Sequence, residues 1–512
     1  MKSDKLSKVK EIKNYFNILT KYPFLSLLLI GIGAITIRLI FFQNELIFNS
    51  DNLLYFSYAI DVSITNELPT TIPLPNNGWP LFLSIFFNLL NSDNFLDYMN
   101  LQSIISMSVS VITIIPLYFL AKKFVGTSFA LLTTILFIFE PRIIANSLIG
   151  VTDSLFILLI VISLVLVLQK KKYLICFAFI VVAFTAIVRS EGLFLIPALS
   201  LILFLRFKIT KKSIFQYLIF ILICSLILLS FSLQRIENSG NDYLVGRIII
   251  SSSGFSDQTQ NDPNQIILKV FESLYIFSKF LGKLMIPYLI IFVPVGIILF
   301  FKNKEIKKSL LIIPGFMLTL PSLYAYTIPA LDSRYLFPIL PILCIIGTYS
   351  FVKYFEKTNH KEIITILLVL IILSSSILFL IYKNQGIENQ QEILELSSII
   401  NKNTNIILYI QLSPVISHLD PAELFELKKF PVLSSNWNMD SNVKIVEYTN
   451  IENFFSNMKK NGITHIVIDR EINNPRIINQ IFDNYEKYNN LKKIFDSQEN
   501  NFNYKIEIFE IK

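Results

Sequence analysis

Apolar segments of bilayer-spanning length follow one another along the sequence as far as residue 382. A helix needs about 20 predominantly apolar residues to cross the hydrocarbon core of a membrane. We count about eleven such segments: Pro23–Phe42, Tyr98–Leu120, Phe124–Phe139, Asp153–Leu168, Tyr173–Val188, Gly192–Leu205, Ser213–Leu233, Leu281–Phe301, Leu310–Thr327, Tyr335–Val352 and Ile363–Tyr382. The sequence therefore predicts a polytopic α-helical membrane protein with about 11 transmembrane helices.

The composition excludes the main soluble alternatives. Of the 512 residues, 53% are hydrophobic and only 16% are charged, whereas soluble chains carry about 25% charged residues. A disordered chain is excluded as well, because disordered segments are poor in aromatic residues and this chain has 45 Phe. The apolar run Trp79–Leu90 is about half a span long and indicates a re-entrant or interfacial segment.

Basic residues are concentrated in every second loop and in the N-terminal tail. The loop residues are Lys122, Lys123, Lys170, Lys171, Lys172, Arg206, Lys208, Lys211, Lys212, Lys302, Lys304, Lys307, Lys308, Lys353, Lys357 and Lys361. The positive-inside rule places this side in the cytoplasm, so the net charge of +8 reports topology and not nucleic-acid binding. We expect a cytoplasmic tail at 1–22, a transmembrane region at 23–382 with outer loops at 43–97 and 234–280, and an extracytoplasmic domain at 383–512.

Unusual polar residues gather on the opposite, outer side. They are Arg38, Asp51, Glu140, Arg142, Asp153, Arg189, Glu191, Arg235, Arg247, Asp332 and Arg334. Arginine presents a planar fork of donors that matches phosphate oxygens. Because nucleotide donors are largely confined to the cytoplasm, an outer-face enzyme that handles phosphate is expected to use a lipid-linked donor. The chain has three His and none of the P-loop or hydrolase motifs, so carboxylates would carry the proton chemistry.

Asp51 is the strongest single candidate for a base. It follows the first apolar segment in Ser50-Asp51-Asn52, ahead of an aromatic-rich stretch, and the alternative interpretation is a helix N-cap. This arrangement is similar to the polytopic GT-C glycosyltransferases, and in particular to protein O-mannosyltransferases and lipid A aminoarabinose transferases. In that family the first-loop Asp is the essential carboxylate, and Asp51 matches it. Family members often carry Asp-Glu at this point, whereas this chain has Asp51-Asn52.

Three further stretches carry the same resemblance, and they keep the family's order and sidedness. They are Glu140-Pro141-Arg142 through Thr152-Asp153, Val188-Arg189-Ser190-Glu191-Gly192, and Asp332-Ser333-Arg334-Tyr335-Leu336-Phe337-Pro338. The resemblance implies a GT-C-like membrane region and an enzyme that moves a mannose-like hexose from a polyprenyl-phosphate carrier, dolichyl or undecaprenyl. The acceptor would be a hydroxyl group of a protein, lipid or glycan at the outer membrane face.

The resemblance also implies a role for each site residue. Asp51 would be the general base. Three arginines would bind the donor phosphate: Arg142, Arg189 and Arg334. Two acids would orient the acceptor or a metal ion such as Mg²⁺ or Mn²⁺: Glu140 and Asp153. Three residues would support these groups: Glu191, Asp332 and Tyr335.

Each assignment has a structural alternative. Asp153 could cap its helix, Glu140 could only pair with Arg142, and Asp332 could be the local partner or cap of Arg334. Arg38 could reach the membrane interface by snorkelling.

One carboxylate suffices for this chemistry. A polyprenyl phosphate is a good leaving group as an anion, so no general acid is needed, in contrast to glycoside hydrolysis. A base that removes the acceptor proton opposite the leaving phosphate would give inversion, while arginines stabilise the developing phosphate charge. The alternative function is a transporter or flippase for a lipid-linked or anionic solute. Such a protein would be expected to carry charges at the membrane midplane, which are scarce here.

After Tyr382 the sequence predicts a small α/β domain. The expected strands are Asn405–Ile410, Val443–Val446, Thr464–Ile468 and Tyr504–Phe509, and the expected helices are Ile451–Lys460 and Pro475–Tyr488. The stretch from Asn461 to Asp469 resembles tails of prokaryotic members of the same family. Its His465 is interpreted as a packed strand residue. The domain would handle the acceptor or support a lid, and a second alternative is a membrane-anchored binding protein in which this domain acts alone.

Overall fold

The computed structural model describes residues 21–42, 50–69, 74, 76–92, 95–207, 210–240, 242, 263–302, 308–327, 332–355, 358, 361–383, 396, 408–409, 443–444, 451–460, 463–470, 479 and 483–511. The chain divides into two compact units. The first unit comprises Met1–Phe42, Pro73–Leu83 and Gln102–Tyr382, and the second comprises Gln43–Ile72, Ser84–Leu101 and Lys383–Lys512.

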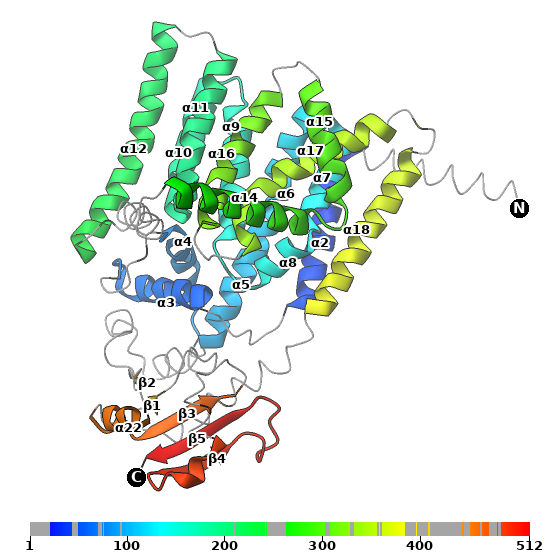
Figure 1. Cartoon of the computed structure of the whole chain (residues 1–512). Coiled ribbons are helices and arrows are strands. Elements are labelled where there is room, and N and C mark those ends of the chain that lie inside the picture. Colours follow the sequence, from blue (N-terminus) through cyan, green and yellow to red (C-terminus); the bar gives the residue numbers. More distant parts are fainter. Residues whose placement is uncertain are drawn as a thin grey trace, which may run out of the picture. The chain divides into compact units, whose positions relative to one another are not determined.

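The described part of the first unit is a bundle of helices (Figure 1). Its elements are α2 (Pro23–Phe41), α6 (Ile114–Val125), α7 (Thr127–Ile138), α8 (Pro141–Leu148), α9 (Asp153–Val167), α10 (Lys172–Val188), η1 (Ser190–Phe194), α11 (Leu195–Arg206), α12 (Lys211–Ser239), α14 (Pro263–Met285), α15 (Leu289–Lys302), α16 (Ser309–Ala325), η3 (Ser333–Ile339), α17 (Leu340–Phe355) and α18 (Lys361–Lys383). Helices α4 (Gly78–Phe87) and α5 (Phe95–Ile112) each contribute residues to both units.

All eleven segments expected to span the membrane are helical. Among the described residues, five helices are long and apolar enough to cross a membrane, and seven spans result if two bent pairs each count as one. Helices α9, α10 and α16 fall among the shorter apolar helices. The protein is therefore a multi-pass membrane protein, and the orientation of its ends stays a prediction.

Two sharp bends interrupt the bundle. Helices α7 and α8 meet at 54°, and α14 turns by 112° into α15, so α14 runs across the bundle (Figure 1). Helix α14 begins in the segment expected as an outer loop, 234–280, and ends five residues beyond it at Met285. Helix α12 also extends into that segment, as far as Ser239. The apolar residues of α14 recur with helical periodicity, so the sequence alone could have indicated this helix.

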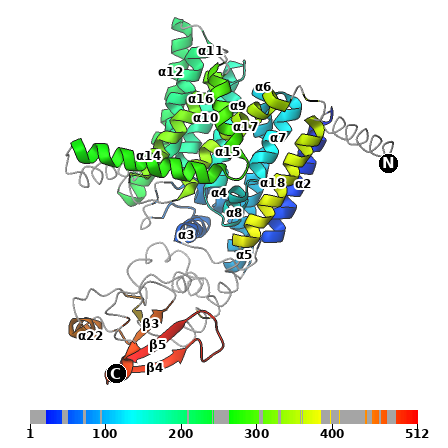
Figure 2. The ribbon, with the colours of Figure 1, turned by 45° about the vertical axis from the view of Figure 1, so that its right-hand side comes forward.

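Helix α8 packs beside α2 and α18, which lie side by side (Figure 2). Ile144 and Ala145 of α8 contact Leu380 of α18, and Ile37 and Phe41 of α2 pack against the same cluster. The helices differ widely in burial. Only 6% of the most apolar stretch of α12 is buried, whereas 89% of the span that contains α17 is buried. Helix α12 therefore lies at the periphery of the unit, and α17 lies in its centre.

The second unit contains α3 (Ser50–Thr65), α22 (Ile451–Lys460) and a five-stranded sheet. The strands are β1 (Leu408–Tyr409), β2 (Val443–Lys444), β3 (His465–Asp469), β4 (Leu491–Asp496) and β5 (Ile506–Ile511), in the order β2-β1-β3-β5-β4. Strand β1 is parallel to β2 and β3, whereas β5 is antiparallel to β3 and β4. The mixed sheet packs on α22 through Phe454, Met458, Ile466 and Phe509.

The sequence located four of the five strands and helix α22, and it missed β4. Strand β4 reads Leu-Lys-Lys-Ile-Phe-Asp, in which two adjacent lysines hide the alternation expected of a strand. Half of the helix expected at Pro475–Tyr488 falls outside the described residues, and its end forms a 3₁₀ turn at Tyr485–Lys487. His465 lies in β3 as expected, paired across the ladder with Glu510.

Candidate functional site

The chain reverses direction at the end of α10, within the motif Arg189-Ser190-Glu191-Gly192. Arg189 is the C-cap residue in an extended conformation, and its carbonyl oxygen accepts a hydrogen bond from the Gly192 N–H at 2.9 Å. A Cβ atom at Gly192 would lie 2.7 Å from the backbone nitrogen of Ala186, so only glycine fits this close return onto α10. The turn places the side chains of Arg189 and Glu191 together.

Arg189 is held between two carboxylates. Its Nη1 forms an ion pair with Asp153 Oδ1, and its Nη2 forms one with Glu191 Oε1 at 2.8 Å. Asp153 is the first residue of α9, and its second oxygen accepts a hydrogen bond from Asn146 Nδ2 at 3.2 Å. Within the described residues, the Asp153 side chain accepts from Arg189 and Asn146 and from no backbone N–H, so the structure shows an ion pair there and not a helix cap.

Aromatic rings flank the same guanidinium. The Arg189 Cζ atom lies 5.4 Å from the ring centroid of Phe156 and 6.0 Å from that of Tyr335. Tyr335 belongs to η3, and its carbonyl oxygen accepts a hydrogen bond from Ser322 Oγ at 2.6 Å, which ties η3 to α16. The ring contacts and ion pairs fix one orientation of the Arg189 side chain.

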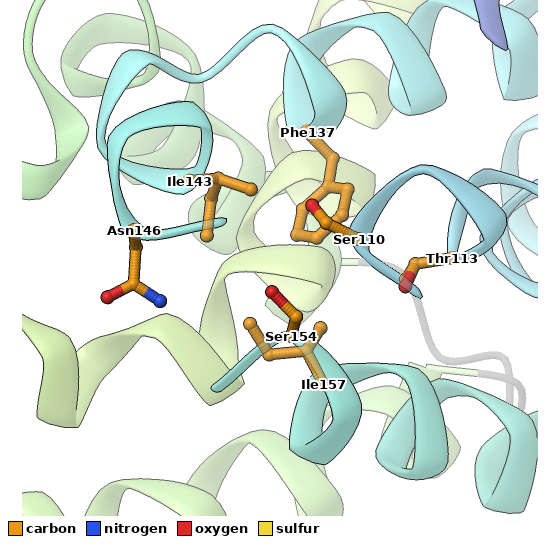
Figure 3. Close-up of a pocket in the computed structure, with 7 residues that line it drawn as sticks. All are labelled: Ser110, Thr113, Phe137, Ile143, Asn146, Ser154 and Ile157. Carbon is orange, nitrogen blue, oxygen red and sulfur yellow. The ribbon is translucent and has the colours of Figure 1, made fainter. Parts of the chain in front are cut away.

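A small cavity lies beside Asp153, lined by polar side chains such as Ser110, Asn146 and Ser154 and by the apolar Phe137, Ile143 and Ile157 (Figure 3). Its free volume is about 10 Å³, roughly enough for one water molecule. Because Asn146 also binds Asp153, the cavity and the ion-pair cluster share a wall. We refer to Asp153, Arg189, Glu191, Phe156, Tyr335 and Asn146 as the Arg189 cluster.

The loop before Asp153 is anchored by two long side chains. Trp79 Nε1 and Gln102 Nε2 both donate to the carbonyl oxygen of Gly150, at 2.9 and 2.8 Å. Gly150 has φ +70°, a left-handed conformation that favours glycine. The start of α9 is therefore positioned by α4 and α5 as well as by Arg189.

Glu140 and Arg142 form a second pair, at the bend between α7 and α8. The Glu140 carboxylate caps α8, since Oε2 accepts hydrogen bonds from the backbone N–H groups of Arg142 and Ile143 at 2.7 and 2.9 Å. The other oxygen binds Arg142 Nη1 at 2.7 Å, and the same nitrogen donates to Ile286 O at 3.2 Å. The Glu140 bonds stabilise the bend, and the Arg142 bond to Ile286 ties α8 to the turn between α14 and α15. These contacts agree with the structural interpretation of Glu140.

Arg334 forms a more exposed pair. Its Nε atom lies 2.6 Å from Asp332 Oδ2, and the two side chains are 33% and 40% exposed. Asp332 also caps η3 through the Arg334 N–H at 2.9 Å, so it is both the partner and the cap. An exposed pair of this kind is worth only about 0–1 kcal/mol.

Asp51 lies in the first turn of α3 with an exposed side chain. Since α3 belongs to the second unit, its role as a base stays a prediction. Arg235 lies on α12, not in a loop, and forms an ion pair with Asp242 at 3.1 Å. Arg247 lies outside the described residues.

The snorkelling interpretation of Arg38 is wrong, because the residue is completely buried. Its guanidinium donates to Ser147 Oγ and Ser110 Oγ, each at 3.0 Å, and to the carbonyl oxygen of Ile138 at 3.4 Å. Ile138 ends α7, so the cation compensates the partial negative charge at that helix terminus. Arg38 thereby holds together α2, α5, α7 and α8.

The Arg189 cluster does not fit a divalent metal ion. The guanidinium already occupies the position between the two carboxylates that a cation would take. Within the part of the chain that the structure describes, no three His, Cys, Asp or Glu side chains come together as metal ligands. The expectation that Asp153 and Glu140 orient a Mg²⁺ or Mn²⁺ ion is therefore not supported by the donor set.

Sequence reasoning missed Asn146, Phe156 and Asn76. Asn76 Oδ1 accepts a hydrogen bond from the Ser190 N–H at 3.1 Å and so steadies the Arg189 turn. Gly78 lies two residues further on, and a Cβ atom there would lie 2.8 Å from the backbone nitrogen of Val188. The Asn-Asn-Gly sequence before α4 is a turn signal that could have indicated a close approach.

Comparison with known proteins was decisive for the family. Residues 97–474 match the family described as a predicted membrane protein, DUF2079. The chain belongs to this family. No curated protein matches the sequence significantly.

Solved structures with the same fold are membrane glycosyltransferases of the GT-C class. The Archaeoglobus fulgidus oligosaccharyltransferase in complex with Zn and sulfate has a TM-score of 0.59 and 11% identity, with coverage of 87% of this chain and 68% of that one. AglB from the same organism, in complex with an inhibitory peptide and a dolichol-phosphate, has a TM-score of 0.57 and 11% identity, with coverage of 88% of this chain and 70% of that one. ArnT from Cupriavidus metallidurans, bound to undecaprenyl phosphate, has a TM-score of 0.52 and 8% identity, with coverage of 94% of this chain and 97% of that one. The expected resemblance to the GT-C fold is confirmed, and at these identities it establishes the fold alone.

Proposed function

We propose that this DUF2079 protein is a glycosyltransferase that moves a sugar from a polyprenyl-phosphate carrier to an acceptor hydroxyl at the outer membrane face. The observation that carries the proposal is a group of oriented charges in a GT-C fold, the Arg189 cluster together with Arg334, which is adjacent to Tyr335 of the cluster. Two proteins of similar fold were solved with dolichol-phosphate and undecaprenyl phosphate, which supports the choice of donor.

Within this proposal the arginines have different roles. Arg189 carries one positive charge between two carboxylates, so the cluster has a formal charge of −1 and does not attract a phosphate by itself. Arg334 is adjacent to Tyr335, whose ring contacts Arg189, and its own exposed pair with Asp332 is weak enough to be exchanged. Arg334 would therefore contact the donor phosphate, while Arg189, itself held by the buried Asp153, keeps Glu191 in position for the acceptor.

Asp51 would act as the general base. Its carboxylate is exposed, so an acceptor hydroxyl can reach it. Removal of the hydroxyl proton allows the acceptor oxygen to attack the anomeric carbon, and the carbon–phosphate-oxygen bond breaks with the electron pair on the departing polyprenyl phosphate. Attack opposite the leaving group inverts the anomeric configuration. Arginine would stabilise the charge that develops on the phosphate oxygens.

The test is transfer of radiolabelled hexose from dolichyl or undecaprenyl phosphate by the purified full-length chain, with a panel of acceptors. We expect Asp51→Asn to lower the rate about 10²–10⁴-fold and Arg334→Gln about 10²–10³-fold. Asp97→Asn is the matched control for the base, because Asp97 is also an exposed acid in the first turn of a helix. An Asp51→Asn enzyme as active as the Asp97→Asn control would refute the assignment of the base.

A further inference from the structure

A second cavity lies at the N-terminal end of α10, away from Arg189. Helix α10 has 17 residues, so the two ends are roughly 25 Å apart at 1.5 Å per residue. The cavity has a free volume of about 190 Å³ and lies between α10, α11 and α12. The positive-inside rule predicts that this end faces the cytoplasm.

One side of this cavity is cationic. Lys172 of α10 and Lys212 of α12 line it, and Lys172 Nζ donates to Gln216 Oε1 at 2.7 Å. Neither lysine forms an ion pair with a carboxylate of the described chain, and no carboxylate lines the cavity. Between residues 166 and 220 the only acid is Glu191, which lies at the far end of α10.

The neighbouring cations are already engaged. Lys123 Nζ donates to the carbonyl oxygen of Leu168 at 3.0 Å, and Arg206 Nη2 donates to that of Gln169 at 3.2 Å. These bonds satisfy the C-terminal end of α9. Lys172 and Lys212 are thus the cations that face the cavity itself.

The other side of the cavity is apolar and continues onto a lipid-facing helix surface. Ile175, Phe207 and Phe220 line the cavity. On α12, Ile219 lies on the same helix face as Lys212 and Gln216 and is 38% exposed, in a helix whose apolar stretch is only 6% buried. A ligand with a negatively charged head and an acyl chain matches both sides, whereas a free anion would use only the lysines.

We propose that this cavity binds the phosphate headgroup of an anionic phospholipid from the leaflet on the cytoplasmic side. The two lysines contact the phosphate, and an acyl chain lies along the exposed face of α12. The site is separate from the proposed donor site and does not depend on it.

The test is native mass spectrometry of the full-length protein in neutral detergent, titrated with phosphatidylglycerol and with phosphatidylethanolamine. We expect tighter binding of phosphatidylglycerol, and a loss of about fivefold per lysine, or roughly 25-fold, in the Lys172→Gln/Lys212→Gln variant. The matched control is Lys302→Gln/Lys353→Gln, which removes two exposed lysines from the same predicted side but outside the cavity. The control should bind phosphatidylglycerol like the unmodified protein.

Three outcomes would overturn the proposal. Equal binding of the two phospholipids would show that charge does not select the ligand, and equal losses in both variants would show general surface attraction. Binding of inorganic phosphate alone as tightly as phosphatidylglycerol would show that the acyl chain contributes nothing and would identify the ligand as a free anion. Since all four side chains changed here are exposed lysines, neither variant is expected to unfold, and the thermal unfolding midpoint in detergent checks this.

Discussion

Loss of the Arg189 charge should destabilise the first unit, because two carboxylates would lose their cation. The side chain of Asp153 is 1% exposed, and breaking a buried pair from one side costs about 3–5 kcal/mol. Asp153→Asn should cost less, about 1–2 kcal/mol, because Arg189 keeps Glu191 at 2.8 Å. The double variant Asp153→Asn/Arg189→Gln removes both buried charges and should recover at least about 2 kcal/mol of the Arg189→Gln loss.

Trp79 provides a local reporter for this cycle. It is completely buried and binds the Gly150 carbonyl oxygen, three residues before Asp153. The chain has two Trp, so a Trp437→Phe background leaves Trp79 as the single fluorophore excited at the red edge. Chemical unfolding in detergent is monitored by the red shift of the Trp79 emission. It gives the free energy of unfolding of the parent, the two single variants and the double variant.

Two results would refute this reasoning. If Arg189→Gln unfolds at the same denaturant concentration as the parent, the carboxylates do not depend on Arg189. If the double variant is no more stable than Arg189→Gln, so that the coupling energy is below about 0.5 kcal/mol, the two residues are independent despite their contact.

Two further predictions concern the Arg189 turn and the C-terminal sheet. Gly192→Ala should displace the turn, because its Cβ would lie 2.7 Å from Ala186 N, and should lower both transfer activity and the unfolding midpoint. Gly282→Ala, which meets nothing within 4 Å, should leave both unchanged. Burial alone would raise the pKa of Asp496, but hydrogen bonds from Lys493 and from a backbone N–H lower it below its ordinary 3.8. The contribution of Asp496 to stability is therefore complete above that ordinary value and is lost as the pH falls through the lowered pKa. Pulse hydrogen exchange of peptide 491–496 should show this acid-induced opening, and Asp496→Asn should abolish its pH dependence.

The helical segments could be predicted because hydropathy is a local property of the sequence. Each apolar stretch needs a bilayer or a packed bundle around it, whatever its neighbours are. The same holds for α22, whose alternating faces are visible in ten residues. The motif from Arg189 to Gly192 could also be recognised, because a charge pair beside glycine at a helix end is unusual in a membrane chain.

The partners of the site residues could not be predicted, because they depend on contacts between distant segments. Nothing in the local sequence of Asp153 distinguishes a helix cap from an ion pair with Arg189, since both use the same carboxylate. Arg38 was misread for the same reason. Its burial depends on Ser147 and Ile138, which are distant in sequence and meet it only when α7 and α8 bend.

The most direct test of the proposed function is a single transfer assay with matched variants. Purified protein in lipid nanodiscs is supplied with a radiolabelled hexosyl polyprenyl phosphate, and release of the polyprenyl phosphate is measured together with the label in the acceptor. We expect stoichiometric release and transfer by the unmodified chain and by Asp97→Asn. Asp51→Asn should lose at least about a hundredfold in rate, because the loss of a general base costs ~10²–10⁴-fold. Release without dependence on Asp51, or no transfer from any polyprenyl-phosphate sugar, would contradict it.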